Sequence, residues 1–249
     1  WGGPRRMEAT IKFVIYTMVG SLLMLASVIV FGLQQGSFSM LQSPVSSDWI
    51  FLGFAAAFVV KAPLFPFHGW LPDAYRESPA EVSAVLSGVI SKAAAFGFLR
   101  ICFSLFPAGV QDFRTPILVL AASGLIYGSL LAFRAPDLRG VIAYSSLAQM
   151  GLITLGLFAV NDLGLNGAVL QMVNHGLISA SLFLLAGGIE RVRRPRRRRG
   201  RRRRGTAPGP SRRPRDDRRE GLEEGPDRAL WIRDGPRRGR APPPRTRAG

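Results

Sequence analysis

The stretch that decides the fold is residues 51–99, which read FLGFAAAFVVKAPLFPFHGWLPDAYRESPAEVSAVLSGVISKAAAFGFL. It holds two long apolar segments, and each carries one lysine near its middle, Lys61 and Lys92. A proline-rich, partly polar segment joins them. An ammonium group at the centre of a membrane helix costs about 2.5–3.5 kcal/mol on insertion scales. Two such charges in adjacent segments indicate that protons or ions move inside the bilayer.

The whole chain divides into an apolar body and a basic tail. Its formal net charge is +17, and residues 191–249 supply nearly all of it, with twenty-three arginines against seven acidic residues. Residues 1–190 contain repeated apolar runs near the length of about 20 residues needed to cross a bilayer. These runs lack the charged outer faces of soluble amphipathic helices. The single cysteine, Cys102, excludes an internal disulfide and any multi-cysteine metal or iron–sulfur site.

The fold class predicted from these runs is an all-α polytopic membrane protein with about six transmembrane helices. The predicted spans cover residues 11–32, 49–65, 80–106, 115–133, 139–160 and 165–189. Pro63 and Pro66 should break the second span, because proline lacks an N–H group and clashes with the preceding turn. We expect residues 67–79 to cross along the membrane surface.

Cationic residues mark one set of helix ends. They are Arg5, Arg6, Arg76, Arg134, Arg139 and the tail, whereas the opposite loops carry Asp48, Asp112, Asp162 and Arg114. By the positive-inside rule, both ends of the chain should face the cytoplasm. The predicted location is the cell inner (plasma) membrane.

The tail, residues 191–249, has no hydrophobic periodicity and is predicted to be disordered. One interpretation is electrostatic binding of nucleic acid or acidic lipid by the run RRPRRRRGRRRRG. However, every cationic residue of the tail is arginine, which is what a GC-rich gene gives when read out of frame. We therefore favour a frameshift or gene-end artefact that begins near Arg191, and we expect no nucleic-acid partner. Because the chain begins with Trp1 and not Met, we expect a fragment or a processed product.

Lys61 lies two residues before Pro63. Pro63 should free the carbonyl of Val59, and Pro66 that of Ala62. Unpaired backbone at membrane depth is tolerated only inside protein or beside a water-filled cavity. This favours a lysine that lines a hydrated path. The alternative is that Lys61 lies near a helix end and extends its ammonium to the interface.

Lys92 lies about a dozen residues into the third span. Burial disfavours the charged form of a lysine, and this is how such a group becomes able to release its proton. The alternative is a structural ion pair with an acid of a neighbouring helix. No acid of this chain is expected at a similar depth, so that partner would come from elsewhere.

His175 is the third candidate of the relay, in the sixth span. Gln171, His175 and Ser179 are spaced by four residues and so share one helix face. Histidine titrates near neutrality and relays protons, although a lone buried histidine is as readily a structural residue. In the fifth span, Ser145 and Gln149 form a second pair that either holds water between the relay groups or bonds neighbouring helices. Two histidines far apart, His68 and His175, do not make a metal site.

Residues 59–100, VVKAPLFPFHGWLPDAYRESPAEVSAVLSGVISKAAAFGFLR, closely resemble the proton-pumping antiporter-like subunits of respiratory complex I. The wider family includes Mrp-type cation/proton antiporters and membrane-bound hydrogenase subunits. Flanking matches are WGGPRR, IAYSSLAQMGL and MVNHGLISASLFLLAGGIE. The resemblance covers about residues 1–190 and is strongest to the chain M members of NADH-quinone oxidoreductase.

The resemblance implies a discontinuous helix with a proton-channel lysine at Lys61, a connecting lysine at Lys92 and a histidine relay position at His175. Some members carry a second histidine where this chain has Gln149, which cannot take up a proton near neutral pH. The family also implies helices before Trp1, with a glutamate that pairs with Lys61, and an exit channel after the tail. Residues 1–190 would then be an incomplete proton-translocation region that does not pump alone.

The resemblance further implies a membrane subunit of NADH:quinone oxidoreductase that moves protons while electrons pass through other subunits. It implies no cofactor and no metal on this chain, with NADH, quinone, FMN and iron–sulfur clusters in partner subunits. The expected partners are the lipid bilayer and other membrane subunits of complex I. The alternative is a subunit of an Mrp-type sodium/proton antiporter or of a membrane-bound hydrogenase.

Overall fold

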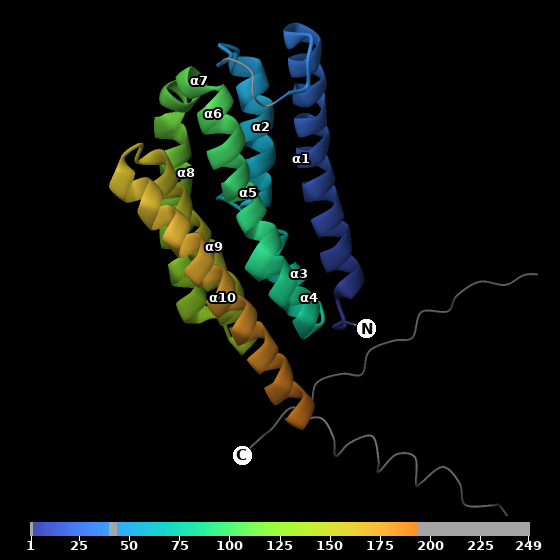
Figure 1. Cartoon of the computed structure of the whole chain (residues 1–249). Coiled ribbons are helices and arrows are strands. Elements are labelled where there is room, and N and C mark those ends of the chain that lie inside the picture. Colours follow the sequence, from blue (N-terminus) through green and yellow to red (C-terminus); the bar gives the residue numbers. More distant parts are fainter. Residues whose placement is uncertain (1, 40–43, 194–249) are drawn as a thin grey trace, which may run out of the picture. The chain divides into compact units, whose positions relative to one another are not determined.

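The computed structural model describes residues 2–39 and 44–193, and within them the chain is helical and has no strand. The helices are α1 (Arg6–Gln35), α2 (Asp48–Lys61), α3 (Leu71–Glu77), α4 (Ala80–Val85), η1 (Leu86–Ile90), α5 (Ser91–Gly97), η2 (Phe98–Cys102), α6 (Phe103–Leu105), α7 (Pro107–Asp112), α8 (Arg114–Arg134), α9 (Leu138–Phe158) and α10 (Asp162–Arg193). Figure 1 shows the long helices side by side. This confirms the predicted all-α membrane fold.

Five segments in the described part of the chain are long and apolar enough to cross a membrane. They are Arg6–Gln35, Ala80–Leu105, Arg114–Arg134, Leu138–Phe158 and Asp162–Val192. The pair α2 and α3 supplies the sixth crossing, because α2 alone has only 14 residues. The last helix continues to Arg193, past the predicted end at residue 189. The rest of the predicted tail, residues 194–249, lies outside the described residues.

The expectation that residues 67–79 run along the membrane surface is wrong. They continue the second crossing beside the first half of α1 (Figure 1). The rings of Phe13 and Trp70 meet edge to face, 5.2 Å apart. One turn further along, Lys12 Nζ lies 2.7 Å from Asp73 Oδ2. The polar residues that looked like an interfacial segment are therefore partners for α1 within the bundle.

The third crossing is one continuous run of helix that contains two π turns, η1 and η2. In a π turn the hydrogen bonds reach back five residues, so that one extra residue is accommodated without ending the helix. The N–H of Ser91 donates in this way to the carbonyl of Leu86. Such turns concentrate at functional sites, and η1 ends two residues before Lys92.

A phenylalanine cluster packs α2 against the third crossing. The rings of Phe58 and Phe98 lie 5.3 Å apart, edge to face, and those of Phe54 and Phe106 lie 5.9 Å apart. Each such pair contributes about 0.5–1.5 kcal/mol beyond its area burial. The cluster therefore holds α2 in place immediately before the helix breaks.

Helices α8 and α9 pack closely through glycine. A Cβ atom on Gly151 would lie 2.6 Å from the carbonyl oxygen of Ala121, and one on Gly128 would lie 2.8 Å from the backbone nitrogen of Ala148. Both distances are far below ordinary contact. Small residues that let backbones approach are typical of membrane helix interfaces.

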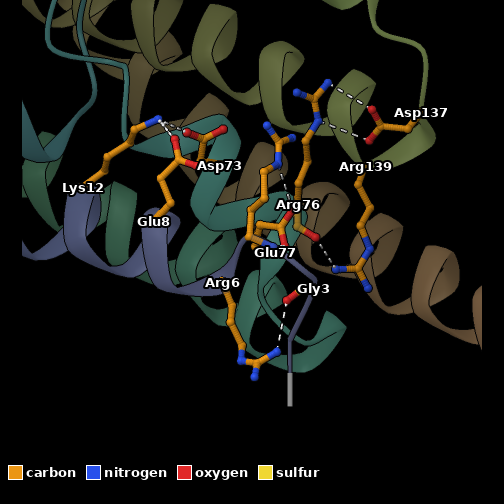
Figure 2. A network of polar contacts seen from close by, with 10 residues as sticks. Gly3, Arg6, Glu8, Lys12, Asp73, Arg76, Glu77, Asp137 and Arg139 are labelled. Atoms are coloured by element: carbon orange, nitrogen blue, oxygen red, sulfur yellow. Dashed lines mark hydrogen bonds and ion pairs between the residues drawn. The ribbon is translucent and has the colours of Figure 1, made fainter. Parts of the chain in front are cut away.

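Charged side chains gather near the start of α1, at one end of the bundle (Figure 1), and Figure 2 shows them from close by. Figure 2 shows Lys12 between Glu8 and Asp73, and Arg76 beside Asp137 at 3.1 Å. Arg139 donates to Glu190 at 2.8 Å. This end contains cations that the sequence predicted to share one side of the membrane.

At the opposite end of the bundle, Arg114 of α8 binds the C-terminal end of α9. Its Nε donates to the carbonyl of Phe158 at 2.9 Å, and its Nη2 donates to that of Ala159 at 2.8 Å. These carbonyls belong to the last turn of α9, where helical partners run out.

Candidate functional site

The break in the second crossing begins directly after Lys61, where α2 ends. The Val59 carbonyl, which Pro63 removes from the regular helical pattern, accepts the N–H of Leu64 at 3.0 Å. The next carbonyl, of Val60, accepts the indole N–H of Trp70 at 3.0 Å. The break is therefore a defined structure in which donors from beyond the prolines satisfy the backbone, as burial requires.

Lys61 lies near the middle of the bundle and not at its edge. Val60 packs against Gly20 of α1, where an added Cβ would lie 3.5 Å from the Val60 Cβ. Gly20 is half-way along the 30 residues of α1. Lys61 is half-buried, and within the described residues its ammonium has no hydrogen-bond or ion-pair partner. This position favours the hydrated-path interpretation over a lysine that reaches the interface.

Trp70→Phe is expected to destabilise the complete subunit by about 1–3 kcal/mol, because it leaves the buried Val60 carbonyl without its donor while it keeps a ring against Phe13. The measurement is the midpoint of denaturation in detergent. Trp49→Phe is the matched control, since Trp49 is 85% exposed and should tolerate the change. Equal midpoints for the two variants would contradict this role of the indole.

Lys92 is only 7% exposed, although it is a charged residue. Its ammonium donates to the carbonyl of Ser87, in the π turn η1, and lies 3.4 Å from the Ser91 hydroxyl. No acidic residue in the part of the chain that the structure describes pairs with it. Its environment is thus made of neutral oxygen atoms, which disfavours a structural ion pair within residues 2–39 and 44–193.

His175, on α10, lies beside Lys92. A Cβ atom added to the next residue, Gly176, would lie 3.9 Å from Lys92 Cε. The side chain of His175 is 6% exposed, and its buried Nε2 has no hydrogen-bond partner among the described groups. The structure therefore packs Lys92 against the turn of α10 that contains His175.

The supporting polar residues make two kinds of hydrogen bond, one between helices and one within a single helix. Gln171 donates to Gln149 at 2.6 Å and so joins α10 to α9. Ser179 donates to the Gly176 carbonyl at 3.3 Å, and Ser145 to the Ile142 carbonyl at 2.9 Å, each within its own helix. The glutamine pair has the geometry of a bond between helices. The water-holding role of Ser145 and Gln149 stays a prediction.

A row of buried serines near Lys92 was missed from the sequence. Ser83, Ser87 and Ser91 are spaced by four residues, and all three are buried. Ser146 of α9, not its neighbour Ser145, lies 3.3 Å from Ser87. The spacing of three serines inside one apolar span was the available signal.

These features define a class of protein: a polytopic membrane protein with a broken helix and a lysine buried in the helix that follows. A family model described as "NADH:quinone oxidoreductase/Mrp antiporter, TM" matches residues 1–203. The chain belongs to this family.

Curated relatives resemble most of the described chain. NADH-quinone oxidoreductase subunit M of Rhodobacter capsulatus is 39% identical over 208 residues, which are 76% of this chain and 41% of that protein. NAD(P)H-quinone oxidoreductase chain 4 2 of Thermosynechococcus vestitus is 42% identical over 195 residues, 75% of this chain and 37% of that protein. The chain thus spans about two-fifths of the length of these relatives.

Solved structures show the same fold. A chain of respiratory complex I from Thermus thermophilus with bound NADH has a TM-score of 0.72 and 37% identity, over 76% of this chain and 42% of that chain. A chain of the Mrp complex from Dietzia sp. has a TM-score of 0.68 and 25% identity, over 74% of this chain and 35% of that chain.

Proposed function

We propose that this chain forms part of a membrane subunit that translocates protons for NADH:quinone oxidoreductase. The observation that carries the proposal is the placement of Lys92, a lysine 7% exposed, bonded to neutral oxygens and packed against Gly176, the residue after His175. A buried lysine changes its charge more readily than an exposed one. Ionisable groups kept inside a membrane bundle mark proton or ion pathways.

In the proposed relay, Lys61, Lys92 and His175 hold the proton in turn. Lys61 receives it at the broken helix, where the chain provides no fixed counter-ion in its described part. Lys92 is the central carrier, because its ammonium contacts neutral oxygen atoms and no carboxylate of the described residues opposes the loss of its proton. His175 accepts next, since Nε2 is buried and still available. Gln149 cannot carry a proton near neutral pH. It accepts a hydrogen bond from Gln171 and thereby joins α9 to α10.

The remainder of the activity belongs to parts outside this chain. The relatives are more than twice as long, and we propose that their additional helices supply a glutamate partner for Lys61 and the exit path. NADH, quinone, FMN and iron–sulfur clusters would act in partner subunits, so that this chain performs no redox chemistry. Other membrane subunits of complex I and the bilayer are the proposed partners. We place the protein in the cell inner (plasma) membrane with the charged end of Figure 2 in the cytoplasm.

The second candidate is a subunit of an Mrp-type sodium/proton antiporter or of a membrane-bound hydrogenase. The structural likeness to the Mrp complex supports the first of these. We favour the assignment to complex I because the sequence identity is 37% to the Thermus thermophilus chain and 25% to the Mrp chain, over similar shares of this chain.

Vesicles that contain the complete assembly test the two candidates. We expect NADH oxidation by quinone to drive a pH change across the membrane that a protonophore abolishes, and that is the same with and without sodium. A pH-sensitive dye and radioactive sodium report the two ions. Sodium uptake exchanged for protons without any quinone reaction would support the antiporter instead.

We also propose that residues 1–190 form the translocation region and that residues 191–249 are a separate basic tail. The Arg-only composition of its cations supports an origin by frameshift near Arg191. Resequencing the locus checks this, and an intact frame with the tail present in purified protein would refute it.

A further inference from the structure

The π turn η1 takes the usual backbone donor away from the carbonyl of Ser87. In a regular α-helix, the N–H of residue 91 donates to the carbonyl of residue 87. Here the N–H of Ser91 donates to the carbonyl of Leu86 instead. Because Ser87 is buried, its carbonyl needs another partner. The turn therefore depends on donors that the regular helical pattern does not supply.

Two side chains that follow the turn donate to this carbonyl. Ser91 Oγ donates to it at 3.0 Å, and the ammonium of Lys92 donates to it as well. A hydrogen bond from an ionised donor is roughly twice as strong as one between neutral groups. The charge of Lys92 thus contributes to holding the wide turn in its present place.

The segment that carries Lys92 lies between two fixed ends. It is α5, with η1 before it and η2 after it. Ala80, at the start of the crossing, packs directly against Gly187 of α10, and the ring of Phe98 lies 5.3 Å from that of Phe58. Since a π turn is one extra residue in an α-helix, moving it along the chain changes the direction only of the residues that it passes. Such a movement rotates Lys92 and leaves both ends in place.

We propose that the charge of Lys92 sets the position of this π turn. The ammonium holds the turn at Leu86–Ile90, and loss of the proton lets the turn move past residue 92. Each residue advances a helix by about 100°, so Lys92 then takes the direction that Ala93 has now. Ala93 is exposed, whereas Lys92 is 7% exposed and packs against Gly176. Lys92 therefore alternates between α10 and the outer face of the described bundle.

The elements that pack against η1 and α5 are α2, α4, α9 and α10. From α10, His175 lies in the turn that packs against Lys92. On α4, Glu81 lies three turns before Lys92 and pairs with Arg191, and α2 ends in a second cation, Lys61. The other charged residues of these elements lie in their first or last turns: Asp48, Arg139, Asp162, Glu190, Arg191 and Arg193. Within the described ranges, no carboxylate thus competes with the Ser87 carbonyl for the ammonium.

The position of the turn does not depend on the proposed function, but its role in pumping does. The first test is a set of high-resolution structures of the complete assembly. In Lys92→Met we expect the N–H of Ser91 to donate to the Ser87 carbonyl, with the wide turn beyond residue 92. In Lys92→Arg the turn should stay at Leu86–Ile90, because arginine keeps the charge. An unmoved turn in Lys92→Met, or the same displacement in both variants, would overturn the proposal.

Lys61→Met is the matched control for these structures. It makes the same change at the other lysine of the proposed relay, which does not bond to the π turn. The turn should therefore stay at Leu86–Ile90 in this variant. A displaced turn in Lys61→Met would show that the movement follows from lost pumping and not from the charge of Lys92, and it would refute the proposal.

The second test removes the extra residue. Deletion of Val89, whose side chain is 66% exposed, should convert η1 into a regular turn while Ala80 and Lys92 keep their present directions. Because the turn is then no longer available to move, pumping should fall about tenfold or more, a fraction of what the loss of a proton carrier costs. The complex should assemble to the same amount. Pumping at the wild-type level would overturn the role of the turn.

The matched control is deletion of Arg100, an exposed residue of η2. It removes the other π turn of the same crossing, which lies after Lys92 and does not bond to its ammonium. This variant should pump like the wild type. If deletion of Val89 pumps like this control while Lys92→Met does not pump, the moving turn is refuted and the proposed function stands.

Discussion

Lys92→Met in the complete subunit is expected to abolish proton pumping while the complex still assembles. Methionine fills a similar volume and is apolar, so it removes the ammonium that donates to the Ser87 carbonyl without leaving a large cavity. A positioned proton carrier contributes about 100-fold or more to a transfer step. Pumping should therefore drop below detection in a vesicle assay with a pH-sensitive dye.

The matched control is Lys12→Met, which makes the same change at the charged end. Lys12 is paired with Glu8 at 2.8 Å and Asp73 at 2.7 Å, and its side chain is 42% exposed. Exposed pairs of this kind contribute about 0.2–1 kcal/mol, so pumping should persist. Full pumping by Lys92→Met would disprove the relay, whatever the control does.

Gly151→Ala is expected to destabilise the subunit by about 1–3 kcal/mol, as overpacking of a close interface does. The new Cβ would lie 2.6 Å from the carbonyl oxygen of Ala121 and 2.8 Å from the nitrogen of Leu125. Both are backbone atoms, so no side-chain rotation relieves the clash. Alanine is intrinsically better than glycine in a helix by about 0.5–1 kcal/mol, and the clash must exceed that gain.

Gly167→Ala is the control for this change, because nothing lies within 4 Å of a Cβ added there. The same alanine should leave stability unchanged or raise it slightly. The measurement is the denaturation midpoint of each variant in detergent. If Gly151→Ala is as stable as Gly167→Ala, then α8 and α9 do not pack as closely as the structure has them.

The long helices could be predicted from sequence because the bilayer imposes a length and a composition on each of them. Predicted residues 115–133 became α8, Arg114–Arg134, and predicted residues 139–160 became α9, Leu138–Phe158. The break after Lys61 was predictable for a similar reason, since proline acts locally on the backbone.

Tertiary pairing was harder to predict. Trp70 and Asp73 have the composition of an interfacial segment, and only the partner helix shows that they face Phe13 and Lys12. Similarly, Ser145 and Ser146 are adjacent and chemically identical. The rotation of α9 in the bundle, which sequence does not specify, decides that Ser146 is the one that contacts Ser87.

The π turn at Leu86–Ile90 affects how residues can be matched between relatives. Each residue advances a regular helix by about 100°, so one extra residue shifts the azimuth of everything that follows. In a relative without this turn, the position reached by simple counting from Ala80 would point away from His175. An alignment must therefore open a one-residue gap within η1 if it is to superpose the lysines of the two proteins.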